Sequence, residues 1–216
     1  MIQLLLAIIY LSFVSLGLPD ALLGSAWPTI YEEFQVPISY AGIISIIISA
    51  GTIVSSLFSD RLTLKLGTGK ITALSVALTA IALFGFSTSN SFWLLCLWAV
   101  PYGLGAGSVD AALNNYVALH YTSRHMSWLH CMWGIGASIG PYIIGSLLSG
   151  GHHWSVGYRY IGFAQVLLSA IILLSLPLWK QTTAENEITP PLPFKQVLKL
   201  PGARAVMICF FSYCAL

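Results

Sequence analysis

Six apolar runs, separated by short polar segments, constrain the fold of this chain more than any other feature of its sequence. They cover residues 2–30, 38–58, 71–88, 92–119, 126–148 and 158–179. A helix needs about 20 apolar residues to cross the roughly 30 Å hydrocarbon core of a bilayer. Each run therefore predicts one membrane-spanning helix, and together they predict an all-α, polytopic membrane protein.

The composition excludes a soluble globular protein. Only 7% of the 216 residues are charged and 57% are hydrophobic, whereas about 25% are charged in an average soluble domain. A chain whose solvent is lipid needs no charged surface. The net charge of +2 and the lack of a basic tract exclude a nucleic-acid partner. The sequence has no CxxC pair, no phosphate-binding loop and no metal-ligand spacing, so we predict no cofactor and no metal.

The chain divides by composition into three parts. Residues 1–179 are predicted to form a six-helix transmembrane bundle. Residues 180–202 are polar and proline-rich and predict a cytoplasmic linker, with a short interfacial helix at residues 194–199. Residues 203–216 are apolar but span only about 21 Å as a helix, which predicts the start of a truncated seventh spanning helix. We therefore expect the bundle to need a C-terminal half or a second copy as its partner.

The distribution of basic residues predicts the orientation in the cell membrane. Eight of the nine Lys and Arg residues follow even-numbered spans: Arg61, Lys65, Lys70, Arg124, Lys180, Lys195, Lys199 and Arg204. Because cytoplasmic loops carry an excess of Lys and Arg, these segments and the N-terminus are expected in the cytoplasm. The first run lacks the basic n-region of a cleaved signal peptide, so we interpret it as the first span.

Two of the seven acidic residues lie inside apolar runs, Asp20 in the first and Asp110 in the fourth. A charged side chain at the bilayer centre costs about 3 kcal/mol or more, and such residues usually face a cavity and mark a path for ions or substrates. We expect these two carboxyl groups to serve proton coupling, solute binding or both. The structural alternative is a protonated aspartate bonded to a neighbouring helix.

The two aspartates belong to an internal repeat. Residues 17–21 and 107–111 share the pattern G-x-x-D-A, 90 residues apart. The first and fourth spans are therefore predicted to be equivalent members of two three-helix units with opposite membrane topology. Inverted repeats of this kind are typical of transporters that bind their substrates near the middle of the membrane.

Other polar and aromatic residues predict the walls of a binding site. Asn114 lies one helical turn after Asp110 and therefore on the same face. His130 and Trp133, three residues apart on the fifth span, also share a face. Trp27 is a candidate for stacking on a sugar ring, although a place in the interfacial aromatic belt explains it equally well. We therefore predict Asp110, Asn114, His130, Trp133 and Trp27 as solute-binding residues.

One enzyme-like motif occurs, Gly136-Ala137-Ser138-Ile139-Gly140, which fits G-x-S-x-G. A nucleophile elbow needs a strand before it and a helix after it, but this motif lies inside a predicted helix. His130 is eight residues before Ser138, which places them about 12 Å apart along one helix. The two cannot pair, so we predict that the protein is not an enzyme.

The segment after the second span carries Asp60-Arg61 followed by Lys65, Gly67 and Lys70. It resembles a signature loop of the major facilitator superfamily, written G-x-x-x-D-R-x-G-R-R. Asp60 and Arg61 match it, whereas Ser56 replaces the first glycine and the second glycine and basic pair are displaced. The layout of six spans, a long linker and a seventh span is also that of this superfamily. The resemblance implies that Asp60 and Arg61 belong to a cytoplasmic latch that moves during transport.

Within the superfamily the chain is similar to the fucose:proton symporter family. The similarity rests on Asp20, on G-x-G-x-x-D-A-x-x-N at residues 105–114 and on L-H-x-x-x-G-x-G-A-x-x-G-P at residues 129–141. It implies proton translocation by Asp20 and Asp110, with Asp110 also binding sugar. The family often has Glu in the fourth span, one methylene longer than Asp110.

The resemblance implies proton-coupled uptake of a sugar or a similar small polar solute by alternating access, with this chain as the N-terminal half. An efflux antiporter for apolar drugs or metabolites is the alternative within transport. An intramembrane enzyme or a non-transporting membrane scaffold is the alternative from other classes.

Overall fold

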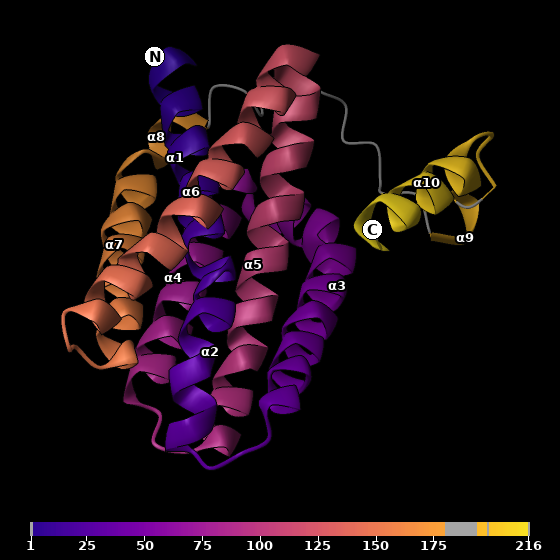
Figure 1. The fold of residues 1–216 in the computed structure, drawn as a ribbon. Coiled ribbons are helices and arrows are strands. Elements are labelled where there is room, and N and C mark those ends of the chain that lie inside the picture. The colour runs from indigo at the N-terminus through magenta and orange to yellow at the C-terminus, as the bar shows by residue number, and fades with distance from the viewer. Residues whose placement is uncertain (1, 180–193, 198, 216) are drawn as a thin grey trace. The chain divides into compact units, whose positions relative to one another are not determined.

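The structure, a computed structural model, describes residues 2–179, 194–197 and 199–215, and these residues form helices without any strand. Figure 1 shows the long helices side by side, with the N-terminus and α8 at one end and the connection after α2 at the other. The elements of the bundle are α1 (Ile2–Asp20), α2 (Leu22–Glu33), η1 (Ile38–Tyr40), α3 (Ala41–Leu66), α4 (Thr68–Thr88), α5 (Phe92–His120), α6 (Ser123–Ser149), α7 (Trp154–Leu174) and α8 (Leu176–Trp179). Residues 186–216 form a second unit with α9 (Phe194–Val197) and α10 (Ala203–Ala215).

Six helical stretches are long and apolar enough to cross a membrane, which confirms the predicted number of spans among the described residues. They are Gln3–Glu33, Ile38–Leu66, Thr68–Thr88, Phe92–His120, Ser123–Ser149 and Trp154–Leu174. The first span consists of α1 and α2, which meet at Ala21. Pro19 lies in the last turn of α1 and cannot donate a backbone hydrogen bond, which explains a helix break at this point.

The polar segment between the second and third apolar runs, residues 59–70, is mostly helical. Helix α3 continues to Leu66, and only Gly67 separates it from α4. Gly67 has a φ angle of 83°, a positive value that glycine adopts at little cost because it has no Cβ atom. Charged side chains do not end a helix when they can reach water, so the helix extends past its apolar run. The predicted linker falls largely on residues 180–193, outside the described part of the chain.

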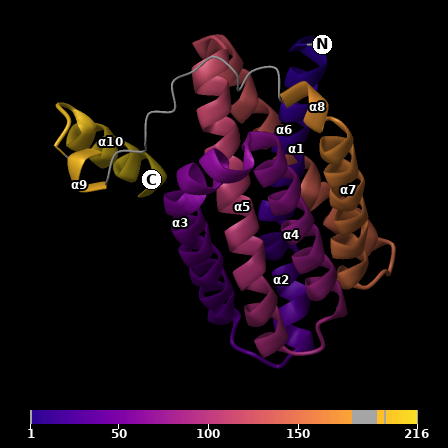
Figure 2. The same cartoon turned by 180° about the vertical axis from the view of Figure 1, so that it is seen from behind.

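The spans pair across the two predicted repeats. Helix α1 packs along α6, α3 packs along α5, and α4 packs along both α5 and α7. Figure 2 shows α3 beside α5 and α4 beside α7. Spans 1, 2, 4 and 5 consist of α1–α2, α3, α5 and α6, in that order. If span 1 is equivalent to span 4 and span 2 to span 5, the pairing of α1 with α6 corresponds to the pairing of α5 with α3. Such an exchange is expected of two intertwined inverted repeats.

Two apolar clusters fill the interior of the bundle. One contains Leu22, Ile30 and Trp154, and the other contains Phe13 and Leu16. The first span runs from the second cluster into the first. Asp20 therefore lies at the junction between the two clusters, where the apolar packing is interrupted.

A polar clamp joins the end of the first span to the start of the sixth. One carboxylate oxygen of Glu33, Oε2, accepts hydrogen bonds from Nε2 of His153 at 2.8 Å and from Nε1 of Trp154 at 2.6 Å. The Nδ1 atom of His153 accepts from the backbone N–H of Ser155 at 3.3 Å and thereby caps α7. Trp154 itself is 0% exposed, so in the folded protein its N–H depends on the Glu33 carboxylate rather than on water.

Replacing Glu33 by alanine is expected to lower the free energy of unfolding by about 1–2 kcal/mol, because a buried indole N–H then loses its acceptor. Glu32→Ala is the matched control, since among the described residues its carboxylate accepts only from the exposed Tyr31 hydroxyl, at 3.1 Å. That control is expected to change stability by less than about 0.5 kcal/mol. Thermal unfolding of both variants in detergent micelles measures the difference, and equal melting temperatures would contradict the role of the clamp.

Candidate functional site

The carboxylate of Asp20 connects three spans. Its Oδ1 atom accepts a hydrogen bond from the Tyr102 hydroxyl on α5 at 2.7 Å. Its Oδ2 atom accepts from Nε1 of Trp133 on α6 at 2.9 Å. Within the described residues Asp20 takes part in no ion pair. A carboxylate held by two neutral donors and no cation can gain or lose a proton without breaking a salt bridge, which suits it to proton transfer.

The sequence analysis identified Asp20 and Trp133 but missed Tyr102. This tyrosine is buried in an apolar cluster, and its position in the fourth span looks like that of an ordinary packing residue. The available signal was its hydroxyl group, since a buried tyrosine usually finds a hydrogen-bond partner. Asp20 was the acidic residue in an apolar run that could have supplied one.

Asp110 makes a different set of contacts, as predicted from its spacing to Asn114. The side-chain amide of Asn114 donates to Oδ1 of Asp110 and to its backbone carbonyl, both at 3.0 Å. The second carboxylate oxygen, Oδ2, accepts no hydrogen bond within the described residues, and the side chain is exposed. Asp110 is also near enough to His130 and to Asp20 for electrostatic interactions with both.

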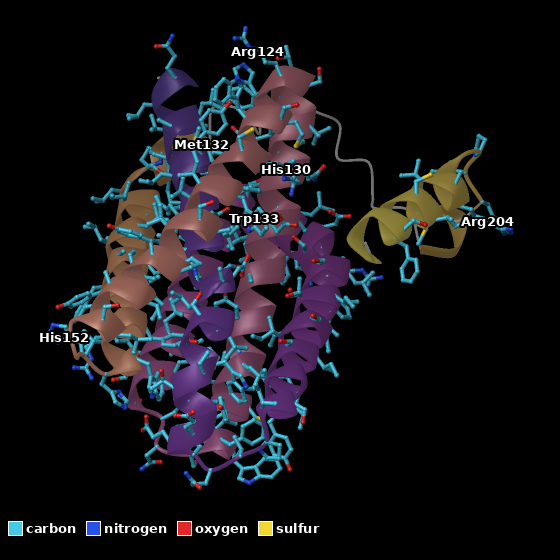
Figure 3. The ribbon with its side chains drawn as sticks, in the orientation of Figure 1. Arg124, His130, Met132, Trp133, His152 and Arg204 are labelled. Carbon is cyan, nitrogen blue, oxygen red and sulfur yellow. The ribbon has the colours of Figure 1, made fainter. Side chains whose placement is uncertain are left out.

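His130 and Trp133 lie next to each other near the middle of the bundle (Figure 3). Both side chains are exposed and both project from α6. The His130 ring contacts Phe13 of α1 edge to face, with 6.1 Å between the ring centroids. The structure therefore brings Asp20, Asp110, Asn114, His130 and Trp133 together on one face formed by spans 1, 4 and 5.

The repeated G-x-x-D-A pattern has the same geometry in both copies. A Cβ atom at Gly17 would collide with the backbone of Trp133 on α6, and one at Gly107 would collide with the backbone of Thr52 on α3. Each glycine therefore permits close packing against the helix that pairs with its own span. The aspartate follows three residues later in both copies.

Trp27 lies apart from this group. Its side chain is 5% exposed and belongs to the apolar cluster around Leu22. Its indole N–H donates to the backbone carbonyl of Ile38 at 2.7 Å. A ring packed in the core and bonded to the backbone offers no free face to a solute, so the structure gives Trp27 a packing role. Asp60 and Arg61 lie exposed in the last part of α3.

These features define a class of protein: a multi-pass membrane protein that builds a polar site from its spanning helices. The chain belongs to the Major Facilitator Superfamily, since the model of that family matches residues 9–216. Members of this superfamily are transporters, which agrees with the prediction that the chain is not an enzyme. A search of curated proteins found no match.

Proposed function

We propose that the protein is a proton-coupled transporter that takes up a sugar or a similarly small polar solute by alternating access. The observation that carries this proposal is the pair of carboxyl groups on spans 1 and 4, which have unlike hydrogen-bond partners. Asp20 is bonded through both oxygens to neighbouring helices, and Asp110 keeps one oxygen free.

This difference supports a division of roles between the two aspartates. The bonds from Asp20 to α5 and α6 connect three spans, so protonation, which replaces charge-assisted hydrogen bonds by weaker neutral ones, weakens the attraction between these spans. The free oxygen of Asp110, the Asn114 amide and the His130 imidazole offer acceptors and donors of the kind that sugar hydroxyls bind. Trp133 adds an exposed aromatic ring beside them.

Two further parts of the proposal concern the orientation of the chain in the membrane and the second wall of the site. The N-terminus lies in the cytoplasm, and Asp60 and Arg61 belong to a latch at the cytoplasmic end of α3. The site faces outward from this six-helix bundle, so a second bundle of the same protein or a second copy supplies the opposite wall.

Export of lipophilic cations is a second candidate function. The observation in its favour is the ring of aromatic side chains near Asp20, namely Phe86, Tyr102, Trp133 and Tyr158. A carboxylate among aromatic rings binds organic cations through charge and cation–π attraction. Competition between L-fucose and tetraphenylphosphonium for the purified protein separates the two candidates.

Uptake of radiolabelled L-fucose into proteoliposomes tests the proposal. An acidic exterior is expected to drive accumulation, because one pH unit supplies about 1.4 kcal/mol per proton, equivalent to a tenfold concentration ratio. A protonophore that collapses the gradient is expected to abolish accumulation. Uptake that persists unchanged without a gradient would contradict proton coupling, and binding of the phosphonium without any sugar binding would favour export.

A further inference from the structure

A cavity of about 200 Å³ lies inside the six-helix bundle beside Asp20. Besides Asp20, its wall includes Gly24 of the first span, Ser45 and Ser49 of the second, and Tyr158 of the sixth. Asp110, Asn114 and His130 do not line it. The cavity therefore shares Asp20 with the proposed solute-binding face but does not include Asp110, Asn114 or His130.

The cavity lies on the side of Asp20 that is nearer the end of the bundle opposite the N-terminus. Gly24 follows Asp20 along α2, which runs toward that end (Figure 1). Ser45 and Ser49 lie near the start of α3, and Tyr158 lies near the start of α7, both of which begin at the same end. Gly24, Ser45 and Ser49 are exposed, so the cavity is open beside them.

A polar group inside the cavity requires a partner. The Tyr158 side chain is 3% exposed, and its hydroxyl makes no hydrogen bond to the described residues. In the described part of the chain, Oγ1 of Thr63 is the one fully buried side-chain oxygen or nitrogen without a partner. The Tyr158 oxygen also has no partner, so it is not fully buried and must border accessible space. For Tyr158 that space is the cavity. A buried hydroxyl without a partner is unfavourable unless water or a ligand bonds to it.

Water fits this space in both size and chemistry. At about 30 Å³ per molecule, the cavity has room for roughly seven waters. The carboxylate of Asp20, the Tyr158 hydroxyl and the Ser49 hydroxyl supply the polar partners that ordered waters need.

We propose that this cavity is a water-filled path that brings protons to Asp20 through its opening beside Gly24, Ser45 and Ser49, along a wall that does not include Asp110, Asn114 or His130. The inference rests on the proposed proton coupling at Asp20. A hydronium ion that enters the path gives its proton to a carboxylate oxygen of Asp20 and becomes water again. The titratable groups that surround this carboxylate are Tyr102, Tyr158 and, across the bundle face, Asp110.

Radiolytic footprinting of the protein in liposomes tests for the water itself. Hydroxyl radicals generated from bound water modify nearby aromatic rings. Phe86, which lines the cavity and is 4% exposed, is expected to be oxidised several-fold faster than Phe13, which is 1% exposed and lies outside it. Equal oxidation of the two phenylalanines would overturn the proposal, whether or not the protein transports a sugar.

A plugging variant tests the role of the path in coupling. A Cβ atom at Gly24 meets nothing within 4 Å, so Gly24→Leu is expected to fill the cavity without disturbing the helices. Gly42→Leu is the matched control, since Gly42 is also exposed and unobstructed but does not line the cavity.

We expect Gly24→Leu to slow oxidation of Phe86 and to reduce uptake driven by a proton gradient several-fold. Exchange of labelled for unlabelled L-fucose at equal pH, which needs no net proton movement, should continue in both variants. The proposal would be overturned if Gly24→Leu and Gly42→Leu showed equal gradient-driven uptake. It would also be overturned if Gly24→Leu lost uptake and exchange to the same extent. If the unmodified protein showed neither uptake nor exchange, the proposed function would be contradicted. The oxidation of Phe86 relative to Phe13 would then still decide whether the cavity holds water.

Discussion

Replacing Gly136 with leucine is expected to destroy the folded bundle. A Cβ atom at this position would overlap the backbone carbonyl of Val14 on α1 and lie 3.0 Å from the backbone nitrogen of Leu18. Backbone atoms cannot rotate away as a side chain can, so α1 and α6 must separate. Overpacking of an interior costs up to about 3 kcal/mol even where side chains can adjust, and more where they cannot. Separation of the two helices would also break the bond between Trp133 and Asp20.

Gly134→Leu is the matched control for this prediction. Gly134 lies two residues earlier on the same helix, and a Cβ atom there meets nothing within 4 Å. Leucine favours a helix over glycine by nearly 1 kcal/mol at either position, so the two variants differ in packing alone. Size-exclusion chromatography in mild detergent, followed by thermal unfolding, measures the outcome. A monodisperse Gly136→Leu protein as stable as Gly134→Leu would show that α1 and α6 do not pack as described.

The spans were predictable from the sequence because lipid imposes a simple requirement on them. About 20 consecutive apolar residues are needed to cross, and few other structures use such runs. The ends of the helices were not predictable in the same way. Polar residues such as Asp60 and Lys65 are compatible both with a loop and with a helix that continues into water, and only the conformation of Gly67 decides between them.

The candidate site could be predicted where a residue is energetically costly inside a membrane, and it stayed ambiguous where a residue carries no such cost. Asp20 and Asp110 stood out because a carboxylate inside an apolar run is expensive. The bond between Asn114 and Asp110 followed from helical spacing. Tyr102 and Trp27 carried no such signal, because an aromatic residue with one polar atom suits a core, an interface or a binding site. Which of these it occupies depends on contacts between distant spans, such as that between Tyr102 and Asp20.

Removing the charge of Asp20 is expected to separate proton coupling from solute movement. In Asp20→Asn the amide oxygen can still accept from the Trp133 indole, which is a donor only. The amide nitrogen can donate to the Tyr102 hydroxyl, because a hydroxyl can turn and accept. Both cross-helix contacts therefore survive, and the variant imitates the protonated carboxylic acid. We expect it to fold normally and to retain exchange of L-fucose at equal pH, while uptake driven by a proton gradient is lost.

The same substitution at Asp110 is expected to act on the solute instead. An amide there can still accept from Asn114, so the local structure is retained, but the charged oxygen that is proposed to bind the solute is lost. A hydrogen bond to a charged group contributes about 1.5–3 kcal/mol, which corresponds to a 10- to 150-fold loss of affinity. Exchange and gradient-driven uptake should therefore both fall in Asp110→Asn, whereas only uptake falls in Asp20→Asn. Identical behaviour of the two variants would show that the carboxyl groups act as one unit, because two groups that bind proton and solute separately cannot fail in the same way.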